Sequence, residues 1–549
     1  MLSETSQAVA ADDKSLWGSI KPYREKGPIT ALCLGISSGF PYALLAATLT
    51  NRLSEAGIER KAISAFALVL LVYSIKWAWA PIVDRVSLPF AKQFGQRRTW
   101  LWLTGAMVAL GVFVLGRADP ANGIQPVLLG ALILAFAGAT FDIVIDAYRI
   151  ESLTPEQLGT GSGMSQYGWR LGSFFAASLA LYVAGETSWT IGYLVCAPFV
   201  LAALLVSLWA GEPPHRQTRD WPQRTSRSSF LQFLIAIPLL LLVARTVDGW
   251  LGVEILFRIT VFGLIYPLID LTIRRLHDLG KNGYFVWLIA LPPIAAAIGN
   301  WPLFLAACAV ALTFLFGIGL RDGQASANQY GDAPAMLEKR NIVGPLADFF
   351  RRKGAWLVFV FVLVHKIGDT MANLMVRDLL VTTGFTKAEI LFGDVWVGFL
   401  SLLVGIFVGG VLYAKLGLKS SVLISLILMC VSNFSFAILA NLGHSLPMLW
   451  VTFGFENFAS GIGGVTVVAF LSAVCNLNFT ATQFAMLSAA SAIVGRFLTG
   501  SMAGRLIDAI GYFDFYLLTT ALAVPGILLF WFMMRTGLVD SAISAASTK

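Results

Sequence analysis

The chain has 549 residues, of which 57% are hydrophobic and only 13% are charged, and its mean hydropathy is +0.75. These values exclude an ordinary soluble protein and predict a polytopic membrane protein. The formal net charge of +8 does not indicate a nucleic-acid partner, because the basic residues fall in short loops between apolar runs, where they act as topology signals.

Apolar runs of about 18 to 25 residues each predict membrane-spanning helices. Six are expected at 29–50, 62–83, 99–117, 124–148, 162–184 and 189–210. Four follow at 230–246, 252–272, 283–299 and 302–320, and six more at 355–378, 388–413, 420–440, 446–474, 483–509 and 513–535. The sequence therefore predicts an all-α protein with about sixteen spans.

Lysine and arginine crowd alternate loops, which predicts the orientation in the membrane. The loops around 14–26, 85–98, 216–227, 274–281 and 339–353 are rich in them, whereas the opposite loops carry few. The positive-inside rule then places both termini in the cytoplasm. The first thirty residues lack an early apolar core, so we expect no cleavable signal peptide, and the first span serves as the insertion signal.

The loop after the second predicted helix carries a cluster of charges. Asp84 and Arg85 end one helix, and Arg97 and Arg98 begin the next. Such a loop can lock two helices together through helix-end and ion-pair contacts. It resembles the D-R-x-G-R-R loop of the major facilitator superfamily, lengthened here between Arg85 and Gly95. A basic loop that only sets topology is the alternative.

Asp142, Asp146 and Arg149 lie on one face of the fourth predicted helix, because they are spaced four and three residues apart. Charges inside a membrane are costly and usually functional. We interpret Asp142, the deeper of the two acids, as a proton-coupling candidate. Asp146 and Arg149 are expected to form an ion pair near the cytoplasmic end of the helix.

The fifth helix of each half contains an intramembrane arginine. In the first half Gln166, Tyr167 and Arg170 share a helical face within a glycine-rich stretch, and glycines of this kind allow close helix packing. Arg170 offers a bidentate donor to a carboxylate of the substrate or of another helix. Arg496 occupies the matching place in the second half.

Further charges lie in the predicted spans of the second half. Lys366, Asp369 and Asn373 follow one stripe, and Glu456 and Asn457 lie in a glycine-rich helix. Asp369 and Glu456 are proton-coupling candidates. The alternative for Asp369 is a structural ion pair with Lys366 of the same helix. The candidate substrate-binding residues are Gln166, Tyr167, Arg170, Lys366, Asn373, Asn457 and Arg496.

The sequence contains no recognisable disulfide, metal-binding, hydrolase or nucleotide-binding motif. The five cysteines lie in apolar runs without C-x-x-C spacing, and the four histidines form no cluster, so neither a disulfide framework nor a metal site is predicted. No Ser-His-Asp array and no phosphate-binding P-loop appears. We expect no enzyme activity, no cofactor and no ATP-driven pump, which leaves an ion gradient as the energy source.

Several ordered motifs resemble the AmpG family of muropeptide permeases in the major facilitator superfamily. They are GISSGFPYAL at 35–44, KWAWAPIVDR at 76–85, the stretch from Phe141 to Gly172, HKIGDTMAN at 365–373, FENFASGIGG at 455–464 and CNLNFTATQFAMLSA at 475–489. The resemblance implies two six-helix bundles that enclose a central site. Weak similarity between the two halves agrees with that architecture.

The resemblance also implies a function. Family members import N-acetylglucosaminyl-anhydro-N-acetylmuramic acid, with or without stem peptide, from periplasm to cytoplasm with protons. By the same route we expect a bacterial inner-membrane location, a role in cell-wall recycling and in β-lactamase induction, and a monomer among membrane lipids. A carrier of another bulky anion such as acetyl-coenzyme A, and a non-transporting sensor or scaffold, are the alternatives.

The middle of the chain departs from the family pattern. SRSSF at 226–230, RRLHDLGKNGY at 274–284 and NQYGDAP at 328–334 resemble a small bacterial membrane domain of unknown function. His277 and Asp278 either bind anionic lipid headgroups or anchor a helix end. The sequence predicts a cytoplasmic N-terminal segment at 1–28, a first six-helix bundle at 29–211 and a cytoplasmic linker at 212–229. An inserted four-helix membrane domain follows at 230–334 and an amphipathic, basic cytoplasmic linker at 335–354. The second six-helix bundle is expected at 355–535 and a cytoplasmic tail at 536–549.

Overall fold

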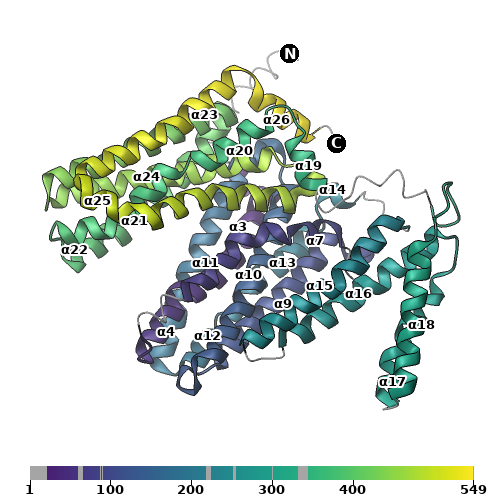
Figure 1. Ribbon diagram of the computed structural model, residues 1–549. Coiled ribbons are helices and arrows are strands. Elements are labelled where there is room, and N and C mark those ends of the chain that lie inside the picture. Colours follow the sequence, from purple (N-terminus) through teal and green to yellow (C-terminus); the bar gives the residue numbers. More distant parts are fainter. Residues whose placement is uncertain are drawn as a thin grey trace. The chain divides into compact units, whose positions relative to one another are not determined.

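A computed structural model describes residues 21–59, 66–86, 88, 91–217, 224–251, 255–298, 301–331 and 344–547. Their contacts divide the chain into two units. Unit 1 comprises 1–85, 93–217 and 346–549, and unit 2 comprises 86–92 and 218–345. Unit 1 therefore contains both predicted six-helix halves, and the region between the halves folds as a body of its own (Figure 1).

All the regular elements described in the first half of unit 1 are helices. Its elements are η1 (Lys21–Arg24), α3 (Lys26–Ala43), η2 (Leu44–Thr48), α4 (Leu49–Glu55), η3 (Ala67–Leu70), α6 (Leu71–Ile75), η4 (Lys76–Ala78), α7 (Ala80–Arg85), α9 (Gln96–Arg117), η5 (Pro120–Asn122), α10 (Ile124–Ser152), η6 (Pro155–Gln157), α11 (Leu158–Glu186), α12 (Trp189–Leu194), η7 (Ala197–Phe199), α13 (Val200–Ala210) and α14 (Pro214–Gln217). The short helix α8 (Ala91–Phe94) contains a boundary between the units along the chain, since unit 2 ends at residue 92 and unit 1 resumes at residue 93.

The regular elements described in the second half are helices as well. Its elements are α19 (Gly344–Phe350), α20 (Ala355–Val364), α21 (Ile367–Thr382), α22 (Lys387–Leu391), η10 (Phe392–Gly398), α23 (Phe399–Leu442), α24 (Leu446–Ala473), η11 (Leu477–Phe479), α25 (Thr480–Arg535) and α26 (Leu538–Ser547). Two of these are each a pair of spans joined at a glycine with positive φ, Gly417 (φ 73°) in α23 and Gly511 (φ 76°) in α25. A side chain would be strained there, so glycine permits the turn between spans.

Helices are the expected solution in a bilayer, because each backbone polar group must be satisfied within its own segment. Within the described residues, ten helical stretches are long and apolar enough to cross a membrane, and two shorter apolar helices accompany them. One of the ten, Lys387–Leu442, covers two of the predicted spans, and the two shorter helices, Leu68–Ala78 and Gly283–Ala295, lie within two others. The chain is a multi-pass membrane protein.

Two predicted helices are broken rather than continuous. The span predicted at 62–83 is described from residue 66 and consists of four short segments, η3, α6, η4 and α7. The span predicted at 355–378 is interrupted at His365 and Lys366, between α20 and α21. Both interruptions lie at a buried or charged polar residue, where a helix inside a bundle can leave regular geometry when neighbouring groups satisfy its backbone.

Glycines bring α3 and α11 into direct backbone contact. A Cβ atom added at Gly168 would lie 2.1 Å from the Leu32 carbonyl oxygen, and one added at Gly172 would lie 2.1 Å from the Ile36 carbonyl oxygen. Neither position has room for a side chain, so the glycine-rich stretch does serve packing. This close contact fixes Gln166, Tyr167 and Arg170, which lie on the same helix.

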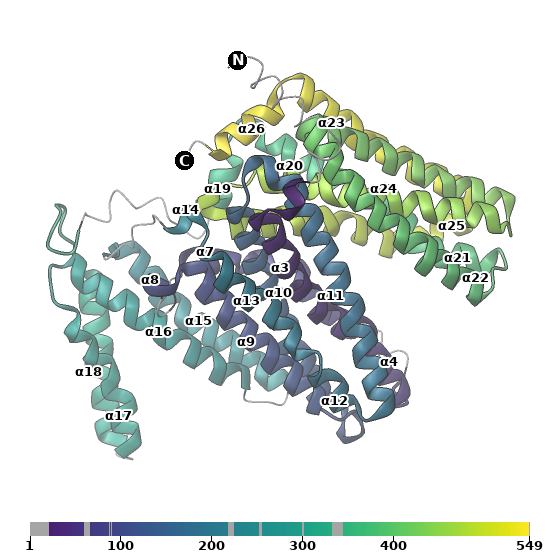
Figure 2. The same ribbon diagram turned by 180° about the vertical axis from the view of Figure 1, so that it is seen from behind.

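The two halves of unit 1 meet near the end that carries α7, α19 and α26 (Figure 2). The Tyr413 hydroxyl donates to the Pro155 carbonyl at 2.9 Å, and the Tyr23 hydroxyl donates to the Phe407 carbonyl at 3.2 Å. Deeper in the bundle, the Tyr167 hydroxyl donates to the Leu403 carbonyl at 2.5 Å. Helices α10 and α11 thereby touch α23 and α25 of the other half.

Unit 2 contains α15 (Arg227–Leu251), α16 (Ile255–Asp278), η8 (Gly283–Ala290), α17 (Leu291–Ile298) and α18 (Trp301–Leu320). Its core is small: Phe230, Leu276, Leu315 and Ile318 are buried together. Many large apolar side chains elsewhere in this unit are exposed, including Ile235, Trp287 and Leu305. Exposed apolar surface of this extent fits helices that face lipid.

Candidate functional site

A lysine lies between the two acids of α10. Lys76, in η4, has its ammonium group hydrogen-bonded to Asp142 and 3.6 Å from the Asp146 carboxylate. The Ser38 hydroxyl of α3 donates to the other Asp142 oxygen at 2.5 Å. The side chain of Lys76 is 8% exposed and those of the two acids about one fifth. Three helices thus build one half-buried charged cluster.

Arg149 adds a second cation to this cluster. It pairs with Asp146 at 3.3 Å, as the three-residue spacing predicted, and donates to the Ser162 hydroxyl at 3.2 Å. Its guanidinium also lies over the ring of Phe484 from the second half, 5.3 Å from the centroid. The cluster of Lys76, Arg149, Asp142 and Asp146 therefore has formally balanced charge and touches both halves.

Arg170 differs from the other arginines of the first half. It is half-buried, its guanidinium lies 5.1 Å from the Trp169 ring centroid, and its Nε has no hydrogen-bond partner among the described residues. Gln166, one turn earlier, lies beside Gly464 of α24. A guanidinium without a carboxylate partner in the described part of the bundle is suited to bind an anion.

Two acids of the second half are joined by an asparagine. The Asn373 amide nitrogen donates to Glu456 at 2.9 Å and to Asp369 at 3.2 Å. The other Glu456 oxygen accepts from the Ser432 hydroxyl at 2.5 Å, and Ser460 donates to the first at 3.2 Å. Both acids are buried. The structure thus brings Asp369 and Asn373, which share one motif, together with Glu456 of another.

Lys366 takes no part in that group. Its side chain is exposed, and the described contacts include no ion pair between Lys366 and Asp369. The alternative of an intrahelical pair is therefore wrong, because the chain leaves α-helical geometry at His365 and Lys366 and α21 begins only at Ile367. The three-residue spacing predicts facing side chains only along a continuous helix.

Asn457 and Arg496 complete the predicted set of the second half. The Asn457 amide donates to the Phe453 carbonyl of its own helix at 3.0 Å and packs on Gly398. The side chain of Arg496 lies outside the described residues, as does that of Arg85. The expected symmetry of Arg170 and Arg496 therefore stays a prediction.

Asp84 links the two halves. Its carboxylate accepts from the backbone N–H groups of Ala481 and Thr482 at 3.3 and 2.9 Å, and from the Thr482 hydroxyl at 2.7 Å. These groups form the first turn of α25, where unpaired N–H groups and the helix dipole favour a negative charge. We name this contact between Asp84 and residues 481–482 the inter-half latch.

Arg97 holds the latch from the first half. It is fully buried, and it pairs with Asp84 at 2.7 Å and with Glu151 at 2.7 Å. The backbone N–H groups of Arg97 and Arg98 donate to Glu212 at 2.8 and 3.1 Å, so this carboxylate caps the start of α9. The ends of α7, α9, α10 and α13 thereby meet in one buried network.

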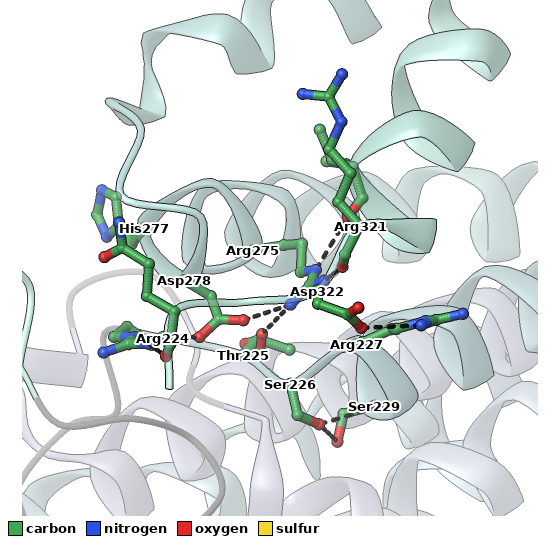
Figure 3. Close-up of polar contacts among 12 residues, drawn as sticks. Arg224, Thr225, Ser226, Arg227, Ser229, Arg275, His277, Asp278, Arg321 and Asp322 are labelled. Atoms are coloured by element: carbon green, nitrogen blue, oxygen red, sulfur yellow. Dashed lines mark hydrogen bonds and ion pairs between the residues drawn. The ribbon is translucent and has the colours of Figure 1, made fainter. Parts of the chain in front are cut away.

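Unit 2 has a separate polar cluster (Figure 3). Asp278, at the end of α16, pairs with Arg224 at 3.0 Å and with Arg275. The two arginines also donate to backbone carbonyls, among them Ser326 at 2.8 Å and Ile318 at 3.1 Å. The rings of His277 and Tyr330 stack, with centroids 3.8 Å apart. These contacts favour the interpretation that Asp278 and its neighbours anchor a helix end.

Sequence reasoning missed Lys76, Glu151 and Glu212. Lys76 had a usable signal, since it is a lone lysine within an apolar run. Glu151 and Glu212 lie at helix ends 54 and 115 positions from Arg97 along the chain. No local spacing could have paired them.

Comparisons with known proteins give relatives over most of the chain. It is 28% identical to the anhydromuropeptide permease of Escherichia coli K12 over 91% of this chain and 78% of that protein. It is 24% identical to the putative transporter AmpG 4 of Rickettsia conorii, over 91% and 94%. Residues 218–332 match a family described as a protein of unknown function, DUF805.

Two solved structures show the fold. A human organic anion transporter has a TM-score of 0.53 and 13% identity, and the match covers 92% of this chain and 99% of the other. A proton:xylose symporter of the major facilitator superfamily has a TM-score of 0.54 and 12% identity, covering 94% and 96%. Relatives and structural neighbours alike are permeases or transporters, not enzymes. The chain is a multi-pass membrane protein with the fold of the major facilitator transporters; its sequence resembles the AmpG permeases, and between its two halves along the sequence it carries a DUF805 match.

Proposed function

We propose that the chain imports anhydromuropeptides, that is, N-acetylglucosaminyl-anhydro-N-acetylmuramic acid with or without stem peptide, together with protons. Transport runs from periplasm to cytoplasm across the bacterial inner membrane, with both termini cytoplasmic. The similarity to the anhydromuropeptide permease of Escherichia coli supports the substrate, and the distribution of lysine and arginine supports the orientation. Import would serve cell-wall recycling and influence β-lactamase induction.

The observation that carries the proposal is the balanced cluster of Lys76, Arg149, Asp142 and Asp146 within the first half. Two cations and two anions at the membrane interior satisfy each other. A proton added to either aspartate leaves one cation without its partner, and that cation then attracts an anion. Proton and anionic substrate would therefore bind cooperatively, which is the requirement for symport.

The remaining polar groups supply a place for the substrate and a second site for protons. Arg170 is available to a carboxylate of the stem peptide or of the muramic acid, with Gln166 and Tyr167 on the same helical face. Asp369 and Glu456, joined by Asn373, form the corresponding acidic group of the second half. Lys366, Asn457 and Arg496 remain candidates for substrate contact.

Alternating access requires contacts that hold one end closed and then release it. The inter-half latch and the Tyr413–Pro155 hydrogen bond join the halves at the end that the loop charges assign to the cytoplasm. We therefore take this conformation as closed toward the cytoplasm. Release of Asp84 from α25 would open that end.

Uptake of labelled anhydromuropeptide by cells tests the proposal. Asp142→Asn and Glu456→Gln should each reduce concentrative import while membrane levels stay unchanged. Asp540→Asn is the matched control, because that acid is exposed and pairs only peripherally with Lys419. Wild-type accumulation by both variants would make the carboxylates structural. Robust uptake of another bulky anion, such as acetyl-coenzyme A, without muropeptide uptake would sink the substrate assignment.

A further inference from the structure

Helix α19, at the start of the second half, contacts the same turn of α25 that receives Asp84. This helix, α19, carries Asp348, and Arg352 follows one turn later. The Asp348 carboxylate accepts from Arg352, from the Gln483 amide at 3.1 Å and from the Asn476 amide at 3.3 Å. Gln483 directly follows Thr482 of the inter-half latch.

Arg352 contacts the same connection between α24 and α25. It donates to the Gln483 side-chain oxygen at 3.0 Å and to the Val474 carbonyl at 2.8 Å. The same Gln483 oxygen accepts the backbone N–H of Asn476 at 2.8 Å. Residues 474–483, the connection from α24 to α25, are therefore held at both ends by Asp348 of α19 and by Arg352, which follows that helix.

The residues that join α19 to the first turn of α25 are largely shielded from solvent. Gln483 is fully buried and Thr482 nearly so. Phe349, next to Asp348, lies in the apolar core with Phe484 and Leu487 of α25. Although burial alone would raise the pKa of Asp348, its hydrogen bonds and its pairing with Arg352 bring the pKa below the usual range. The carboxylate is thus ionised and firmly held at neutral pH.

We propose that Asp348 and Arg352 are positioning residues for the inter-half latch: they hold the first turn of α25 in the geometry that Asp84 caps. Thr482 and Gln483 are consecutive, so the latch contact from the first half and the α19 contact from the second act on one helical turn. The role of the latch in opening rests on the proposed transport function.

A double-mutant cycle tests the inference without substrate. Cys475 is buried within the connection from α24 to α25, so its rate of alkylation by maleimide reports opening of this end. The other four cysteines are replaced by serine, and the full chain is reconstituted in liposomes. Asp348→Asn and Asp84→Asn should each raise the rate about tenfold, since each removes a charge-assisted hydrogen bond.

The two changes together should raise the rate no further than the larger single effect, because both act through one turn. Multiplicative effects, about a hundredfold together, would show that Asp348 acts independently of the latch and would overturn the inference. An unchanged rate in Asp348→Asn would overturn it as well. Asp348→Glu should restore the slow rate in part, and Asp540→Asn should leave it unchanged. None of these outcomes depends on which solute is carried.

Discussion

Replacement of Lys76 by methionine probes the charged cluster most sharply. Methionine keeps the length of the side chain and removes the ammonium group that contacts Asp142 and Asp146. Arg149 then faces two carboxylates alone. Removing one partner of a buried ion pair typically costs about 3–5 kcal/mol, because it leaves an uncompensated charge. A cost of about 3 kcal/mol corresponds to a factor on the order of a hundred in a rate constant or an equilibrium constant.

We therefore expect Lys76→Met to reduce gradient-driven uptake about a hundredfold and to lower the thermal unfolding temperature in detergent. The double variant Lys76→Met with Asp142→Asn should regain stability, because Asp146 again balances Arg149, but should not regain coupling. Lys419→Met, at an exposed pair, is the control. If Lys76→Met kept wild-type stability and gradient-driven uptake, the counter-ion role of Lys76 would be refuted.

Three further changes test packing, unit 2 and pH dependence. Gly172→Val should sharply reduce the yield of folded protein in size-exclusion chromatography, since its Cβ would meet the Ile36 carbonyl, whereas Gly185→Val, which has open space, should not. Asp278→Asn leaves Arg224 and Arg275 without their shared buried carboxylate and should lower the unfolding temperature more than Asp322→Asn at an exposed pair; equal shifts would contradict the anchoring role. Burial raises the pKa of Glu212 despite the N–H groups of Arg97 and Arg98, so the folded state binds its proton more tightly, and stability falls as the pH rises above the ordinary glutamate value, about 4.3. Thermal unfolding of Glu212→Gln across that range should show a flatter pH dependence, and an unchanged slope would exclude Glu212 as its source.

The helices and their order were predictable because a bilayer requires each spanning helix to be apolar and about 20 residues long, and such runs can be recognised in the sequence. The Asp146–Arg149 pair was predictable as well, since α10 is regular over its whole length. The Lys366–Asp369 alternative failed for the complementary reason: side-chain spacing has meaning only on an uninterrupted helix, and the break at His365 and Lys366 had no signal that hydropathy could detect.

Contacts between distant segments mark the limit of sequence reasoning for the site. The charges of Asp84 and Arg97 were recognisable as helix-end groups, but their partners were not. Thr482 lies almost four hundred positions after Asp84, and Glu212 caps α9 from the connection between α13 and α14. Such pairs arise from the tertiary arrangement of helix ends, which local periodicity does not encode.

Uptake by the purified protein in proteoliposomes tests the central proposal most directly. Labelled anhydromuropeptide is presented outside, with the outside either more acidic than the lumen or at equal pH. The proposed symport predicts accumulation above the external concentration only with the inward proton gradient, and its collapse on addition of a protonophore. Accumulation that ignores the gradient, or no uptake of this solute by folded protein, would contradict it.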